Sequence, residues 1–153
     1  MFKLHRYLGG RTAIALGGEG LFTDGSFVDD LGETFYVVVG HVVQGMTSPR
    51  LGVGRLHLSA GVGSGRFSST SDRDVSEGKR SNGTWIFGNS TLEVAEDVNI
   101  IVEWAGINLH AGVSKAFQVD EVSISFSLAV ADLTGFSSDG TRLLLGGAMA
   151  VQF

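Results

Sequence analysis

The chain has 153 residues, which fits one domain built around a single core. It contains 23 Gly, 1 Pro and no Cys, and 18% of its residues are charged, so it fits neither a disordered segment nor a disulfide-stapled miniprotein nor a cysteine-ligated metal site. Its net charge is -5 and its 11 basic residues are scattered, which argues against nucleic acid as a partner.

Two kinds of membrane-directed segment are missing from the sequence. No apolar window approaches the roughly 18 residues of a spanning helix. Residues 1–10 lack the apolar stretch of a secretory signal, so we expect that an exported protein would already have lost its signal peptide.

Alternation of apolar and small polar residues is the main structural signal, and it is typical of strands with two different faces. It is clearest over residues 122–130 and 141–153. The β-branched residues of the second half of 92–104 favour strand over helix there. In chain order, we expect eight strands, near residues 11–22, 34–44, 51–66, 85–94, 98–104, 107–116, 122–130 and 141–153. Residues 1–10 are expected to form an N-terminal tail or an extra strand.

Two hairpins are predicted in detail. A two-residue turn at 105–106 would place Trp104 opposite Ile107 and Glu103 opposite Asn108, which keeps apolar and polar side chains on separate sides. A one-residue slip would mix them, so this separation favours the proposed register. The preceding hairpin would use a three-residue connection at 95–97.

The predicted connections differ in length at the two ends of the strands. If the strands run up and down, three long polar connections fall at one end, together with the turn at 105–106, and the shorter connections fall at the other. This asymmetry is typical of transmembrane β-barrels. The long connections are 23–33, 68–84 and 131–140, and the shorter ones are 45–50, 95–97 and 117–121.

The last strand has apolar residues at alternate positions up to a terminal Phe, in the order Leu143, Leu145, Gly147, Met149, Val151 and Phe153. It resembles the C-terminal assembly signal of bacterial outer-membrane β-barrel proteins. The resemblance implies an all-β fold, an antiparallel up-and-down transmembrane barrel of about eight strands over residues 11–153. It also implies a location in the bacterial outer membrane, with the lipid bilayer and the barrel assembly machinery as partners.

We expect a structural or surface-interaction role, carried by the long loops, and no enzymatic activity. In an eight-stranded barrel, side chains fill the interior, so an open pore is not expected. Two alternatives remain. One is a soluble β-sandwich subunit that self-associates, and the other is the C-terminal half of a larger porin-like channel.

The candidate site residues form two groups. The combination of His110 with Ser114 and Glu103 fails as a catalytic triad, because four residues along a strand span about 13 Å. The four His lack metal-ligand spacing, so no metal or other cofactor is expected. The predicted inward polar cluster contains Arg55, His57, Glu93, Asn99, Glu103, Asn108, His110 and Lys115. The predicted contacts for an unidentified surface ligand are Asp72, Arg73, Asp74, Lys79 and Arg80.

Overall fold

The computed structural model describes residues 2–20, 33–45, 47, 55–79 and 82–151. The described chain is all-β and forms one antiparallel sheet, in which nine strands lie in sequence order. A short 3-10 helix, η1 (Gly65–Phe67), and a five-residue helix, α1 (Asp72–Ser76), lie between β4 and β5. The strands are β1 (Phe2–Gly9), β2 (Thr12–Glu19), β3 (Thr34–Val42), β4 (Leu56–Gly63), β5 (Ile86–Ala95), β6 (Val98–Trp104), β7 (Leu109–Val119), β8 (Val122–Ala131) and β9 (Arg142–Val151).

All eight predicted strands are present, and the extra N-terminal strand is β1. β1 pairs with β2 through a tight turn at Gly10 and Arg11, both of which have positive φ. The predicted strands over 11–22, 51–66 and 141–153 extend into residues outside the described part of the chain, and the terminal Phe153 is one of them. Their described portions, β2, β4 and β9, have the expected antiparallel neighbours.

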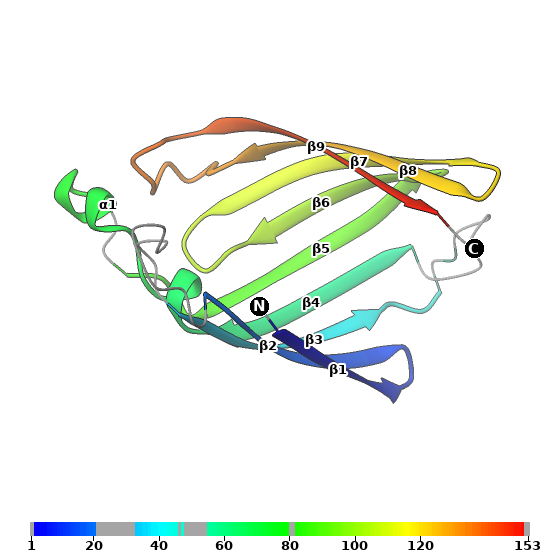
Figure 1. The fold of residues 1–153 in the computed structure, drawn as a ribbon, viewed down its shortest axis with the longest axis horizontal. Helices are drawn as coiled ribbons and strands as arrows, with labels where there is room; N and C mark the ends of the chain where they lie inside the picture. Colours follow the sequence, from blue (N-terminus) through cyan, green and yellow to red (C-terminus); the bar gives the residue numbers. More distant parts are fainter. Residues whose placement is uncertain (1, 21–32, 46, 48–54, 80–81, 152–153) are drawn as a thin grey trace.

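The connections separate into two rims, as predicted (Figure 1). The ends of β2, β4 and β8 lie at one end of the strands, together with the connection between β6 and β7. We call this end the long-loop rim and the opposite end the short-turn rim. All but the last residue of the predicted long connection 23–33 lies outside the described residues. In the described part of the chain, the sheet is not closed into a barrel, because β1 pairs only with β2 and β9 pairs only with β8.

The predicted register of the β6–β7 hairpin is wrong by two residues. Trp104 lies opposite Leu109 and Glu103 lies opposite His110, so the connection spans residues 105–108. A two-residue shift leaves every side chain on its original face, which is why the alternation did not detect it. The longer connection contacts the β4–β5 loop, where the Thr84 N–H donates to the Gly106 carbonyl at 2.8 Å.

The β5–β6 hairpin contains a bulge. Leu92 lies opposite Ile100 as predicted, but Ala95 pairs with Val98, and the register shifts between Glu93 and Ala95. The extra residue shortens the turn from three residues to two.

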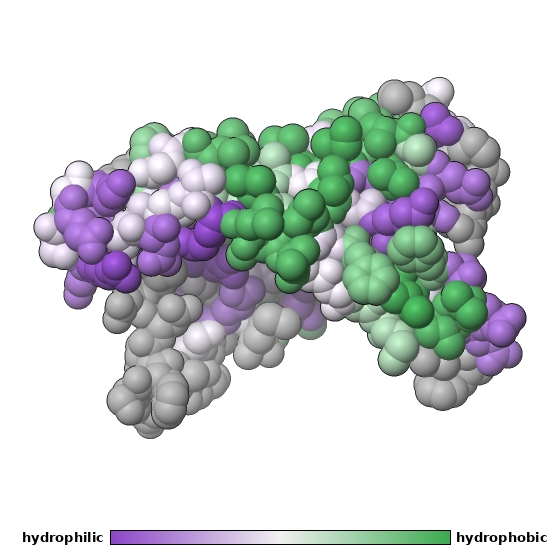
Figure 2. Space-filling view, turned by 90° about the horizontal axis from the view of Figure 1, so that it is seen from above, coloured by the Kyte–Doolittle hydropathy of each residue, from purple (hydrophilic) through white to green (hydrophobic). Residues whose placement is uncertain are grey.

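The sheet separates its side chains into two faces. The cross-strand pairs place bulky apolar residues of all nine strands on one face, which we call the outward face. Figure 2 shows part of this surface as an apolar band across the middle of the molecule, with hydrophilic residues gathered at the α1 end. Exposed members of the outward face include Leu4, Leu16, Val37, Val39, Leu58, Val62, Ile100, Val102, Val113, Phe126, Leu128, Leu143, Leu145 and Met149.

The opposite face, called the inward face, carries mainly small and polar residues. Among the described residues, Ala131 is the only buried hydrophobic one. A single sheet has no second layer to cover its apolar side, so the described part of the chain has no hydrophobic core of the ordinary kind.

Candidate functional site

The inward face borders a hollow of about 710 Å³. Lys3 and His5 reach it from β1, Glu19 from β2, Asn89 from β5 and Glu103 from β6. Cationic and anionic groups therefore line the same space. A surface of this kind is compatible with water, and it contrasts with the apolar outward face.

An aromatic cluster covers part of this wall near the long-loop rim. The ring of Phe67, in η1, stacks on Phe87 with a centroid distance of 4.0 Å. Tyr36 meets both rings edge-on, at 6.2 and 6.1 Å. Glycines provide the space for these rings, because a Cβ at Gly61 would collide with Phe87 and a Cβ at Gly63 would collide with Phe67. Gly61 and Gly63, on the inward face of β4, thus leave room for the rings of Phe87 and Phe67.

Polar contacts hold η1 against the sheet. The Arg66 N–H donates to Thr34 Oγ1 at 3.1 Å, which fastens η1 to the first residue of β3. The Arg66 guanidinium also lies 3.3 Å from a carboxylate oxygen of Glu19 and 5.6 Å from the centroid of Phe67. The ion pair is partly exposed, so we expect it to contribute to orientation more than to stability.

Five of the predicted inward polar residues lie on the inward face. The register places Glu103 opposite His110 and Glu93 opposite Asn99. Glu93 is buried, and its carboxylate accepts a hydrogen bond from the Asp97 N–H at 3.4 Å. The five residues are His57, Glu93, Asn99, Glu103 and His110.

Of the other three predicted residues, Arg55 and Asn108 lie outside the strands and Lys115 lies on the opposite face. Arg55 precedes β4, and its carbonyl accepts a hydrogen bond from the Glu93 N–H at 3.0 Å. Asn108 belongs to the β6–β7 connection. Lys115 lies on the outward face, with its Nζ 5.4 Å from the centroid of Phe117, so its placement in the inward cluster was wrong. The reason is alternation, because Lys115 follows an inward-facing serine.

His110 is tied to the long-loop rim. Its Nδ1 accepts a hydrogen bond from the Asp132 N–H at 3.1 Å, which requires a ring with an unprotonated Nδ1. That nitrogen is therefore engaged in structure and is not directed at Ser114. Within the described ranges, no three His, Cys, Asp or Glu side chains are grouped as metal ligands would be.

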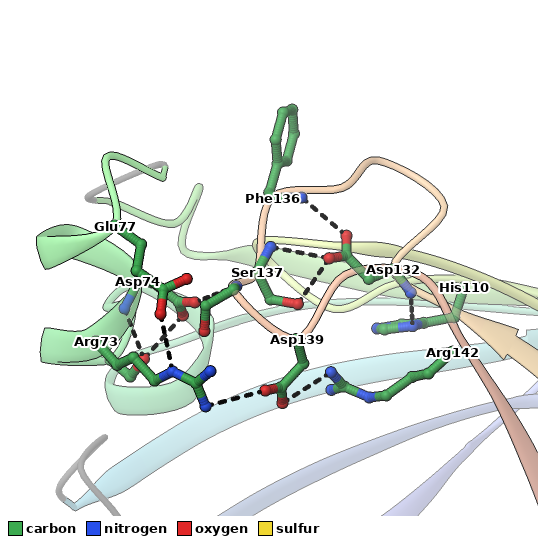
Figure 3. Close-up of polar contacts among 11 residues, drawn as sticks. Arg73, Asp74, Glu77, His110, Asp132, Phe136, Ser137, Asp139 and Arg142 are labelled. Atoms are coloured by element: carbon green, nitrogen blue, oxygen red, sulfur yellow. Dashed lines mark hydrogen bonds and ion pairs between the residues drawn. The ribbon is translucent and has the colours of Figure 1, made fainter.

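The carboxylate of Asp132 organises the β8–β9 loop, residues 132–141 (Figure 3). Asp132 is fully buried, and it accepts hydrogen bonds from the N–H groups of Phe136 and Ser137 and from the hydroxyls of Ser137 and Thr134, at 2.7 to 3.0 Å. Burial by itself would raise the pKa of this carboxyl. The hydrogen bonds outweigh burial and lower the pKa to about 2.

The β4–β5 loop is fastened to the β8–β9 loop beside this carboxylate. Asp74 accepts hydrogen bonds from the Ser138 N–H and from the Ser71 hydroxyl. Burial opposes ionisation of Asp74, but these hydrogen bonds prevail and lower its pKa. Arg73 lies 3.4 Å from Asp139 across the two loops. We call this set of contacts the loop clasp.

The predicted ligand contacts therefore have mixed outcomes. Arg73 and Asp74 bind the neighbouring loop, and Lys79 Nζ donates to the Gly135 carbonyl at 3.3 Å. Asp72 is the first residue of α1, and Arg80 lies outside the described residues.

Sequence reasoning missed both Asp132 and Phe67. A signal for the first was present, because an Asp at the end of a strand, followed by Thr134 and Ser137, is the composition of a side-chain-capped turn. No comparable signal marked Phe67, since its role depends on η1 folding back onto Phe87.

No protein-family model, curated protein or solved structure matches the chain. None of the described helices is long and apolar enough to span a membrane.

Proposed function

We propose that the nine strands form a wall of a β-barrel in a bacterial outer membrane, with a structural or surface-interaction role carried by the long-loop rim. The outward face is the observation that supports this most strongly. Leu145, Met149 and Leu143 are 82%, 71% and 64% exposed, and the charged residues that the described strands place on this face are Arg6 and Lys115. Such a surface is unfavourable in water and favourable in hydrocarbon.

The lengths of the five longer strands, β3, β5, β7, β8 and β9, agree with this proposal. The described strands contain 7 to 11 residues, and a transmembrane strand needs about 9 to 11 when tilted. Ten residues of β9, at about 3.4 Å each and a tilt of about 40°, cover roughly 25 Å along the membrane normal. This height equals the height of the apolar band of outer-membrane barrels.

Aromatic residues gather at the long-loop rim. Phe2, Phe35 and Trp85 are 41%, 47% and 57% exposed there, and Trp104 ends β6 at the same rim. Aromatic rings favour the boundary between hydrocarbon and headgroups. The sequence has only 2 Trp and 2 Tyr, but the phenylalanines extend the aromatic belt at this rim.

The loop clasp supports a surface role at this same rim. Loops that present a binding surface work best when a rigid scaffold fixes them. Here Asp132 fixes the β8–β9 loop, and Asp74 and Arg73 attach the β4–β5 loop to it. Two loops from separate hairpins thus present one connected surface.

A channel is the second candidate, and the charged hollow of the inward face favours it. Phe67 and Arg66 occupy part of that space, which favours a restricted passage over a wide one. Conductance in planar bilayers tests this candidate, since steady open-channel currents would support it and their absence would favour the structural role.

A matched pair of substitutions in β9 tests the membrane proposal. Leu145 faces outward and its neighbour Leu144 faces inward, and both are exposed in the isolated chain. For protein refolded into vesicles, we expect Leu145→Arg to lower the free energy of unfolding in urea by about 2 to 4 kcal/mol. Leu144→Arg should cost clearly less, because its charge remains on the polar side.

The solubility of the unmodified chain provides the opposing outcome. A wall of a membrane barrel should require detergent or lipid throughout purification and refolding. A chain that stays soluble and folded in aqueous buffer would contradict the proposal and would favour the self-associating β-sandwich. Equal losses for the two arginine variants in vesicles would contradict it as well.

A further inference from the structure

The directions of the strands limit how this sheet can close. Each strand runs antiparallel to its neighbours, so all odd-numbered strands point from the long-loop rim to the short-turn rim. β1 and β9 therefore run in the same direction. If these two edges met, they would form a parallel pair in an otherwise antiparallel sheet, whereas bacterial single-chain barrels have an even number of antiparallel strands.

Both edges have groups available for pairing. One side of β1 and one side of β9 lack a hydrogen-bonded neighbour within the described chain. Neither strand contains proline, and the only charged residue of β9 is Arg142, at its start. β9 thus lacks most of the devices that protect an edge, whereas β1 carries two charged residues, Lys3 and Arg6. In hydrocarbon, unpaired N–H and C=O groups each cost several kcal/mol, so the edges must be covered there.

A second copy of the chain does not satisfy these conditions. A two-fold axis along the strands would place β9 of one copy beside β1 of the other, again in parallel. A two-fold axis across the strands would make antiparallel seams, but it would put α1 and the long loops at both rims. This second arrangement conflicts with a barrel that has one long-loop rim.

From these directions, we infer that an odd number of further β-strands, supplied by a polypeptide segment outside these nine strands, pairs antiparallel with β1 and β9 and closes the ring. This inference rests on the proposed membrane function. The strands beside β1 and β9 would run from the short-turn rim to the long-loop rim. Their outward side chains would be apolar, to continue the surface formed by Leu4 and Leu145.

Cysteine cross-linking of the refolded 153-residue chain tests this closure. Leu4→Cys would be combined in turn with Leu143→Cys, Leu145→Cys and Met149→Cys, which sample the possible registers of a β1–β9 seam. The positive control combines Leu128→Cys with Leu145→Cys, because these residues lie directly opposite each other in β8 and β9. Formation of the control disulfide shows that the sheet has formed.

We expect the control pair to cross-link and the three β1–β9 pairs to give neither an intramolecular disulfide nor a cross-linked dimer. Amide hydrogen exchange should be at least about tenfold faster in β1 and β9 than in the central strand β5, because one side of each edge strand is open. An intramolecular β1–β9 disulfide, an edge-to-edge dimer or protected edge amides would each overturn the inference. These results report on the edges in either medium, so they are separate from the solubility and arginine tests of the membrane function.

Discussion

Replacing Asp132 with asparagine should loosen the long-loop rim by a predictable amount. The side chain is fully buried, and hydrogen bonds hold its pKa at about 2 against an ordinary value of 3.8. At about 1.4 kcal/mol per pKa unit, this difference corresponds to about 2 to 3 kcal/mol in favour of the ionised, folded form. An asparagine at this position would keep the shape of the side chain. Its NH2 group, however, would point at N–H or hydroxyl groups that now donate hydrogen bonds to the carboxylate.

The amides of Phe136 and Ser137 give the most direct measurement, since both donate to this carboxylate. For Asp132→Asn, we expect hydrogen exchange at these two amides to accelerate by about tenfold or more, which corresponds to about 1.4 kcal/mol or more of lost protection. Asp120→Asn, in the turn at the opposite rim, is the control and should leave both amides unchanged. Unchanged protection in Asp132→Asn would refute the role assigned to this carboxylate.

Three further predictions concern the same rim and the wall beneath it. Acid should weaken the β8–β9 loop: the carboxylate's pKa is lower in the folded state, so its contribution is complete above about pH 4 and declines as the pH falls toward 2, which exchange at the Ser137 amide can follow. Gly61→Ala should cost about 1 to 3 kcal/mol in urea unfolding because its Cβ would collide with Phe87, whereas Gly147→Ala, with ordinary contact distances, should be nearly neutral. Thr84→Val removes the acceptor 2.9 Å from Trp104 Nε1 and should cost about 1 kcal/mol, with a change in tryptophan emission; an unaltered spectrum and midpoint would contradict this.

Alternation along the sequence predicted much of the sheet. It located eight strands and their up-and-down order, because a strand with two unlike faces has a period of two. It also placed His57 and Glu103 on the inward face. Chain length between strands correctly identified the long-loop rim, since each strand reverses the direction of the chain.

The alternation of apolar and polar residues did not determine the register of strand pairing. The β6–β7 pairing shifted by two residues without moving Glu103 or Trp104 to another face, so a hydrophobic pattern had no means to distinguish the two pairings. In the actual register, the Gly106 carbonyl accepts a hydrogen bond from the Thr84 N–H, a contact between residues that are distant in sequence. Lys115 illustrates a different failure: its charge suggested a polar environment, but alternation places it among apolar residues.

The sequence by itself determined that this chain is a β-meander with one apolar and one small, polar face, because those properties follow from local periodicity and turn composition. Only the tertiary structure decided that Asp132 and Asp74 organise two joined loops, that Phe67 stacks on Phe87, and that β1 and β9 are the edges of the described sheet. Each of these features depends on groups brought together by the curvature and pairing of the whole sheet, and no local pattern records such long-range contacts.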